Sequence, residues 1–402
     1  MQTLYSSLNK LFLFFDSIRL LILSHVDPRV FEAAKYVIVG LFGVMALIQV
    51  WHYWFVFRKV GAYKKTDKDT VLPPTSVIIC AKNEDDNLTR FLPQVLDQDY
   101  PDYEVIVVND CSYDNTGDVL EEFAKKYARL KIVTIKEDEY YRHGKKFALM
   151  CGIKGAKNEC LLLTDADCRP AGNKWLRSMM SNYTDDTTSI VLGYGAYEKE
   201  KGVLNKIIRF DTFYIALQYL SFSLNAKTYM GVGRNLSYRK SLFFKHKGFG
   251  SHYFLESGDD DLFINEAATA TNTKVELGAE GITYSKPKAT FKEWYHQKRR
   301  HITTYKYYKR ESIRQLSLLT ASQYGFWMLF VAALFTQIQP IAILSVFGVR
   351  LLSQLFIFKK AMDRLGERDL LLFSPVFEVF LLFVYPAFSL SNTVIKENKW
   401  KS

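Results

Sequence analysis

The sequence predicts an α/β fold, with a doubly wound and mostly parallel sheet flanked by transmembrane helices. Short apolar runs of strand length alternate with segments of helical spacing between residues 75 and 165. Such alternation is typical of a parallel sheet with helices on both faces. Apolar runs long enough to cross a bilayer lie on both sides of this part.

The first of these runs, Tyr36 to Phe57, carries no charged residue. It is as long as the ~20-residue helix that a bilayer requires. Three further apolar runs follow near the other end of the chain, so we expect four spans and a tail, residues 391–402. The three runs are Leu318–Gln339, Ile341–Phe358, which contains Arg350, and Leu370–Leu390, which contains Glu378.

The segment before the first span, residues 1–35, contains the apolar stretch Leu11 to Val26 with Asp16 and Arg19 inside it. Charges near the middle of a span are costly, so this stretch is expected to be an amphipathic helix in the membrane interface.

Basic residues beside the spans predict the orientation, because cytoplasmic loops carry an excess of Lys and Arg. Clusters follow the first span and precede the second, which predicts a cytoplasmic soluble domain in a multi-pass protein of the cell inner membrane. The tail conflicts with this, since three C-terminal spans would place its lysines outside. The residues concerned are Arg58, Lys59, Lys64, Lys65, Lys306, Lys309, Arg310, Arg314, Lys396, Lys399 and Lys401.

The formal net charge of +11 indicates anionic partners, such as phosphorylated substrates and membrane lipids. Nucleic acid is not expected as a partner, because the basic clusters flank membrane helices. The five cysteines form no CxxC pair, which in a cytoplasmic domain indicates reduced thiols.

The soluble domain, residues 75–290, is predicted to begin with the strands Ser76–Ala81, Tyr103–Val108, Leu130–Ile135 and Cys160–Thr164, with helices between them. Ligands of parallel sheets lie beyond the carboxyl ends of the strands. The residues at those ends are therefore expected to line one rim and to contact substrate. They include Ala81, Asn83, Glu84, Asp110, Asp165 and Asp167.

Asp165 and Asp167 come directly after a buried apolar run. An isolated pair of this kind is more often two solvated acids at a strand exit. However, no Gly-rich phosphate loop follows any of these strands, so bound phosphates would need a divalent cation held by such acids. Asp114 is expected to cap the helix that follows it.

Six segments together resemble the membrane-bound family 2 glycosyltransferases, which include cellulose, chitin and hyaluronan synthases and have the GT-A fold. They are SVIICAKNED, VIVVNDCSYDNT, HGKKFAL, LLLTDADC, SGDDDLF and QKRRH, in this order between Thr75 and Tyr308. The flanking apolar helices match the family layout as well.

The resemblance implies roles for particular residues. Asp110 stands where the family has a uracil-binding aspartate, and Lys145 where it has a lysine near the donor diphosphate. Asp165 and Asp167 match the DxD motif, and both are expected to hold Mg²⁺ or Mn²⁺. Asp165 is also expected to contact the donor. Asp259 matches the general base, although Gly258 stands where the family has a glutamate.

Asp260 follows the expected base directly and is expected to contact substrate; an alternative for these acids is a solvated cap on a helix. Residues 291–314 are expected to form an amphipathic interfacial helix. On it Gln297 and Arg300 match the family's QxxRW segment and are expected to contact the acceptor end and the diphosphate, and Arg299 is expected to contact substrate as well. His301 replaces the tryptophan that lies under the acceptor sugar in the family, which puts processive synthesis in doubt.

We therefore expect a metal-dependent inverting glycosyltransferase that takes a sugar from a nucleotide-sugar donor, UDP-linked in the family, to a lipid-linked or glycan acceptor. Such chemistry serves cell-surface polysaccharide or glycolipid synthesis. Two alternatives stay open: a processive polysaccharide synthase, and a membrane scaffold that binds a nucleotide sugar without catalysis.

Overall fold

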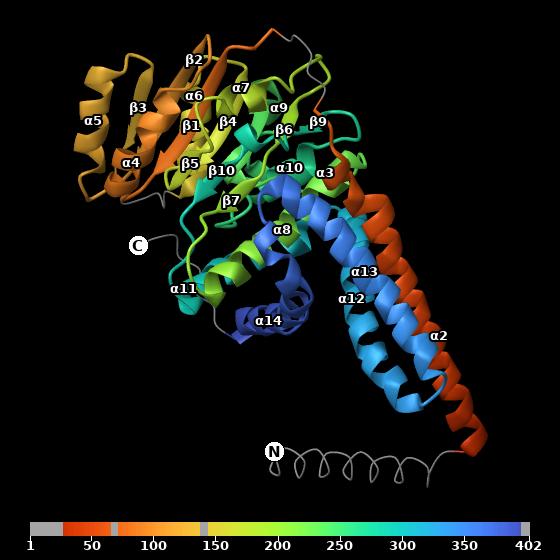
Figure 1. Ribbon diagram of the computed structural model, residues 1–402. Coiled ribbons are helices and arrows are strands. Elements are labelled where there is room, and N and C mark those ends of the chain that lie inside the picture. Colours follow the sequence, from red (N-terminus) through yellow and green to blue (C-terminus); the bar gives the residue numbers. More distant parts are fainter. Residues whose placement is uncertain (1–26, 66–70, 137–143, 395–402) are drawn as a thin grey trace. The chain divides into compact units, whose positions relative to one another are not determined.

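The computed structural model describes residues 27–65, 71–136 and 144–394. The chain divides into two compact units, one of residues 1–52 and 317–353, the other of residues 53–316 and 354–402. Figure 1 shows the elements of both units, coloured along the chain.

The first unit is helical. It contains α2 (Pro28–Trp51), most of α12 (Arg310–Thr336) and the first half of α13 (Pro340–Leu365). The helices pack through an apolar cluster that includes Phe42, Phe326 and Ile343. Arg350 is fully buried here; its Nε donates to Gln49 Oε1 at 2.7 Å and its guanidinium lies 4.8 Å from the Phe326 ring. The charge of this arginine, which lies within an apolar helix, is thus held by polar and aromatic groups inside the bundle.

Four helical segments of the described chain are long and apolar enough to cross a membrane: Pro28–Ala62, Arg310–Thr336, Pro340–Leu365 and Arg368–Asn392. Three of the four predicted runs fall within one of these segments, and the run Leu318–Gln339 overlaps Arg310–Thr336 but ends three residues beyond it. The first segment joins α2 to a π-helical turn, η1 (His52–Phe57), and to α3 (Arg58–Ala62). The predicted interfacial stretch 11–26 lies outside the described residues, and residues 28–35 of the predicted N-terminal segment belong to α2.

The second unit is built on a mixed, mostly parallel sheet of the order β3-β2-β1-β4-β8-β6-β9. All four strands predicted from the sequence are present and run parallel in it. The antiparallel strand β8 joins them to β6 and β9, which are parallel to each other. The strands are β1 (Thr75–Ala81), β2 (Tyr103–Asp110), β3 (Leu130–Ile135), β4 (Cys160–Asp165), β6 (Ile190–Leu192), β8 (Leu236–Arg239) and β9 (Thr273–Val275).

Helices cover both faces of the parallel part (Figure 1). On one face α4 (Asp85–Leu96), α5 (Thr116–Lys126) and α7 (Trp175–Met180) share a core with alternate residues of β1 and β2. On the other face α6 (Lys145–Gly155) packs closely through Gly152. A Cβ atom at Gly152 would lie 2.8 Å from Ile78 Cγ2, so only glycine allows this approach.

A small second sheet has the order β5-β10-β7 and carries parts of the candidate site. Its strands are β5 (Cys168–Pro170), β7 (Gly195–Tyr197) and β10 (Thr283–Ser285); β10 is antiparallel to β5 and parallel to β7.

The other helices of this unit follow the strands or pack beside them. They are α8 (Val203–Leu224), η2 (Gly233–Asn235), α9 (Lys240–Lys245), η3 (Gly250–His252), α10 (Asp261–Ala267), η4 (Ala279–Gly281), α11 (Phe291–Ile302), η5 (Tyr305–Tyr307), η6 (Arg368–Phe373) and α14 (Ser374–Val394).

Candidate active site

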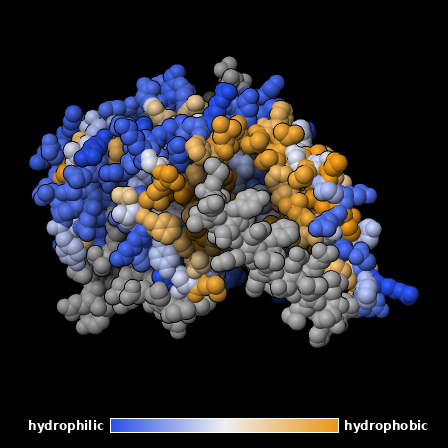
Figure 2. Space-filling view, turned by 60° about the horizontal axis from the view of Figure 1, so that its bottom comes forward, coloured by the Kyte–Doolittle hydropathy of each residue, from blue (hydrophilic) through white to orange (hydrophobic). Residues whose placement is uncertain are grey.

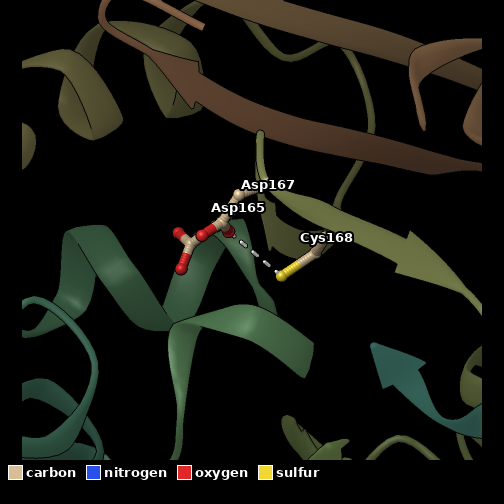
Figure 3. A group of neighbouring side chains, drawn as sticks. All are labelled: Asp165, Asp167 and Cys168. Carbon is tan, nitrogen blue, oxygen red and sulfur yellow. Dashed lines mark hydrogen bonds between the residues drawn. The ribbon is translucent and has the colours of Figure 1, made fainter. Parts of the chain in front are cut away.

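The two acids of the DxD segment lie at the carboxyl end of β4, where the chain turns into β5. Asp165 is the last residue of β4, and Cys168 is the first of β5. Oxygen atoms of Asp165 and Asp167 and the sulfur of Cys168 all lie within 4.8 Å of one another. Figure 3 shows the three side chains turned toward one another.

The electrostatics of this group fit a hard divalent cation. Burial and the negative charge of Asp165 raise the pKa of Asp167. A cation between the two carboxylates would relieve this repulsion, and carboxylate oxygens are the ligands that Mg²⁺ and Mn²⁺ prefer. Burial, together with the neighbouring acids, raises the pKa of the Cys168 thiol well above its usual value. The thiol therefore stays protonated and lies 3.5 Å from Asp167 Oδ1, to which it can donate a hydrogen bond.

Lys145, the first residue of α6, joins two acids from different parts of the chain. Its Nζ lies 2.8 Å from Asp165 Oδ1 and 3.3 Å from Asp259 Oδ2. Burial alone would lower the pKa of Lys145, but the charges of Asp165, Asp259 and Asp260 outweigh it and raise the pKa. For Asp165, burial alone would raise the pKa, and the ion pair with Lys145 lowers it instead. Both partners therefore carry full charges at neutral pH.

The three consecutive acids at residues 259–261 have different surroundings. Asp261 accepts hydrogen bonds from the hydroxyls of Thr304 and Tyr308. Asp260 is the N-cap of α10, and its Oδ2 accepts from the backbone N–H of Gly233 at 2.7 Å. Burial and the two flanking carboxylates raise the pKa of Asp260 to about 7. Asp259 is the acid of the three that faces Lys145.

The departure from the family pattern at Gly258 has a backbone reason. Gly258 has φ +103°, a conformation that glycine adopts without steric cost. A Cβ atom there would also lie 2.5 Å from Leu262 Cδ1. A glutamate does not fit this turn as it stands.

The ends of β1 and β2 form the next part of the rim. Asn83 links them, because its N–H donates to Ser112 Oγ at 3.0 Å and its Oδ1 accepts from the N–H of Tyr113 at 2.9 Å. The N–H of Glu84 donates to Thr116 Oγ1 at 2.9 Å.

The predicted rim residues of these strands lie together. Ala81 ends β1 opposite Asn109, and the buried Asp110 ends β2. The charge of Glu84 also contributes to the raised pKa of Asp167. Asp114 accepts from the N–H of Thr116 at 3.0 Å, as expected for a residue that stabilises the start of a helix.

The QKRRH segment lies on α11, and its residues divide between two faces of the helix. Gln297 Nε2 donates to Tyr197 Oη at 3.1 Å, and the Oε1 of Gln297 is buried without a hydrogen bond in the described structure. The charge of Arg300 is among those that lower the pKa of Asp165. His301 is exposed.

Lys298 and Arg299 lie on the other face of α11. Lys298 pairs with the buried Asp211 of α8, and Arg299 Nε donates to Asn392 Oδ1 of α14 at 2.8 Å. Arg299 is therefore directed toward α14 in this structure, and its contact with substrate stays a prediction. Residues 297, 300 and 301 share one face of a helix, whereas residue 299 is rotated by about 100° from residue 300.

Arg234 is a candidate site residue that the sequence analysis did not identify. Its Nη1 donates to Ser285 Oγ at 2.7 Å, and its guanidinium lies 4.3 Å from the centre of the Tyr197 ring. Its charge contributes to lowering the pKa of Asp165. Gly231 and Gly233 precede it in the sequence, but no spacing pattern distinguishes this arginine.

The chain is similar to known glycosyltransferases. Residues 76–246 match the family model described as Glycosyl transferase family 2. The "Probable glycosyltransferase YdaM" of Bacillus subtilis is 28% identical over 255 residues, which cover 62% of this chain and 59% of that protein. A "Beta-monoglucosyldiacylglycerol synthase" of a Nostoc species is 28% identical over 138 residues, 34% of this chain and 29% of that protein.

Among solved structures, a mannosyltransferase of Pyrobaculum calidifontis in complex with GDP-Man and Mn²⁺ has the same fold. The TM-score is 0.53 and the sequence identity 19%, over 86% of this chain and 98% of the other. The chain thus spans about 59% of the first relative and about 29% of the second.

Proposed function

The chain belongs, through residues 76–246, to the family 2 glycosyltransferases, and from that premise we propose that it transfers a sugar from a nucleotide-diphosphate donor with inversion. One observation carries the proposal: a single ammonium group, that of Lys145, contacts both Asp165 of the DxD segment and Asp259. The acids suited to bind the donor's cation and to activate the acceptor are therefore neighbours, as direct displacement requires.

The roles of the side chains follow from their positions. Asp259 would accept the proton of the acceptor hydroxyl as the general base. Asp165 and Asp167 would hold Mg²⁺ or Mn²⁺, which when bound stabilises the charge of the departing diphosphate. Lys145 and Arg300 would offset the remaining phosphate charge. Asp110, Ala81, Asn83 and Glu84 would contact the nucleoside at the ends of β1 and β2.

The donor and the acceptor are part of the proposal. We propose a UDP-linked donor and a lipid-linked or glycan acceptor at the cytoplasmic face of the inner membrane, reached by a multi-pass chain. The helices long enough to cross a membrane support this location. The name of the Nostoc relative supports a lipid acceptor in particular.

We further propose that the enzyme adds one or a few sugars. His301 is exposed and offers a smaller stacking surface than the tryptophan it replaces in the family. Few spans are available to form a channel for a growing polymer.

Sugar incorporation tests the proposal. Membranes that contain the full chain would receive a panel of labelled UDP- and GDP-sugars with Mg²⁺ or Mn²⁺, beside membranes with Asp259→Asn. We expect incorporation from one donor, lost in the variant, into a product of low mass. A long polymer as the product would refute limited addition.

If the wild-type chain binds a nucleotide sugar and incorporates none with any acceptor extract, the catalytic proposal fails and the scaffold alternative replaces it. Equal incorporation by the wild-type chain and by Asp259→Asn would instead refute Asp259 as the base.

A further inference from the structure

The apolar segment of η6 and α14 contacts the glycosyltransferase domain, residues 75–290, at its beginning. We call this domain together with α11 the catalytic unit. Arg209 of α8 is fully buried, and its Nε donates to Glu367 Oε2 at 2.9 Å. Tyr194 Oη lies 3.2 Å from the other oxygen of Glu367. Asp369 pairs with Arg209 at 2.7 Å and with Lys199 at 2.8 Å.

The end of α14 contacts α11. Arg299 Nε donates to Asn392 Oδ1 at 2.8 Å, and Asn392 Nδ2 donates back to the carbonyl oxygen of Arg299 at 3.0 Å. The Phe388 ring lies 5.5 Å from the ring of Trp294 and 5.0 Å from that of Tyr295.

A third contact lies between these two ends. The hydroxyl of Tyr385 donates to Asp211 of α8, the same buried carboxylate that pairs with Lys298 of α11. One face of α14 is therefore bound to α8 and α11 along much of its length.

This arrangement is incompatible with a crossing of the bilayer. A helix of 21 residues is about 31 Å long, close to the ~30 Å thickness of the hydrocarbon core. If α14 crossed it, one of its two ends would pull its partners into the core or to the far side. The α11 partner cannot enter hydrocarbon, because this helix carries four Lys or Arg side chains, two histidines and one glutamate. They are Lys292, Glu293, His296, Lys298, Arg299, Arg300 and His301, with Lys288 just before the helix.

We therefore propose that η6 and α14 lie along the membrane surface on the side of the catalytic unit, with the outer face of α14 in the boundary between headgroups and acyl chains. Figure 1 shows α14 nearly along its axis, whereas residues 354–365 of α13, in the same unit, are seen from the side. The two helices thus run in different directions, as a surface helix and a span would.

The outer face of α14 has the chemistry that this position requires. Val376, Phe383 and Leu390 are 67%, 74% and 68% exposed and lie on one side of the helix, at intervals of seven residues. Figure 2, which brings the lower side of Figure 1 forward, shows hydrophobic residues in the middle of the view and a mainly hydrophilic surface at its left. A helix with one apolar face outward and its polar contacts inward fits the membrane interface.

The tail after α14 supports the same position. It carries Lys396, Lys399 and Lys401 around Trp400, a composition suited to an anionic lipid surface. If only α12 and α13 cross after the catalytic unit, the tail returns to the side of that unit. The conflict with the distribution of basic residues then disappears. The partner that this surface fits is thus the anionic leaflet next to the catalytic unit.

Depth measurements on two matched pairs of positions test the proposal. Val376→Cys and Ala387→Cys place spin labels on the exposed side of α14, eleven residues apart. Ile341→Cys and Leu352→Cys do the same on exposed positions of α13. Each variant of the full chain would be placed in vesicles of phosphatidylethanolamine and phosphatidylglycerol. The unsubstituted chain, which has five cysteines of its own, gives the background.

Eleven residues of helix correspond to about 16 Å. We expect the two α14 labels to lie within a few ångströms of one depth, just below the headgroups, and the α13 labels to differ by about 10 Å or more. A depth difference in α14 as large as that in α13 would overturn the proposal. The proposal would also be overturned if a water-soluble relaxation agent reached the α14 labels as readily as it reaches a free label in solution.

The position of the tail gives a second readout, which does not depend on the folding of any cysteine variant. A protease site added after Ser402 should be cleaved in sealed vesicles of the orientation in which the protease also digests the catalytic unit. Cleavage only in vesicles of the opposite orientation would refute the proposal. Neither measurement depends on sugar transfer.

Discussion

Two neighbouring arginines on α11 should respond in different ways to the same substitution. Arg299 is 4% exposed and contacts Asn392 and the carbonyl of Ser391 on α14. Arg300 lies one residue further, about 100° around the helix, and its charge acts on Asp165. Arg299→Ala should therefore reduce stability, and Arg300→Ala should reduce transfer.

The size of both effects follows from the contacts. A hydrogen bond to a charged group contributes about 1.5–3 kcal/mol. For Arg300→Ala, this loss in the transition state corresponds to a decrease of about 10- to 150-fold in kcat/KM for the donor. For Arg299→Ala, the same loss in the folded state corresponds to a decrease in Tm of roughly 2–5 °C in a chain of 402 residues.

Both quantities can be measured on the same preparations. Initial rates at several donor concentrations give kcat/KM, and thermal unfolding of the purified chain in detergent gives Tm. If Arg299→Ala lost transfer like Arg300→Ala and kept the wild-type Tm, the division of α11 into two faces would be refuted. Lys in place of Arg300 should recover only part of the rate, because it lacks the planar guanidinium.

Three further predictions concern the acids and the turn before them. Asp167→Asn should reduce the initial rate of transfer by about 100-fold or more at any Mn²⁺ concentration tested, since one electrostatic contact to the transition state is lost; an unchanged rate would contradict the metal assignment. The pKa of Asp260 is raised to about 7, so the folded chain holds a proton that the unfolded chain has already lost. The Tm should therefore fall as pH rises from about 5 to 7 and level off above 7, and Asp260→Asn, whose amide oxygen can still accept from Gly233, should reduce this slope. Gly258→Glu should lower Tm even though it restores the family residue, because φ is positive there and Leu262 occupies the space; an unchanged Tm would show that the turn can rearrange.

Much of the catalytic sheet could be predicted from the sequence, because three of its four parallel strands, β1, β2 and β4, are buried on both faces. Such a strand reads as an unbroken apolar run, and β1 and β4 both do. The strands β6, β8 and β9 were not predicted. They are only three or four residues long, too short for a periodic pattern to stand out.

Some residues of the candidate site could likewise be predicted from the sequence, and others could not. Asp110, Asp165 and Asp259 were predicted because strand ends or ordered motifs mark them. The contact of Arg299 with α14 could not be predicted, because helical spacing gives the angle between side chains and leaves open which face meets which partner. Arg234 required the position of Tyr197, which lies on a strand of three residues.

The small sheet also has a consequence for the order in which the site can form. β5, which follows the acids, pairs with β10, so that Cys168 lies opposite Ser285, more than 100 residues later. Closing so long a loop costs chain entropy that later contacts must offset, and long-range pairings of this kind form slowly. During synthesis β1 to β4 emerge well before β10. A nascent or truncated chain that ends before Ser285 therefore has its parallel strands but lacks the strand that closes the acidic turn, so catalytic competence comes late in folding.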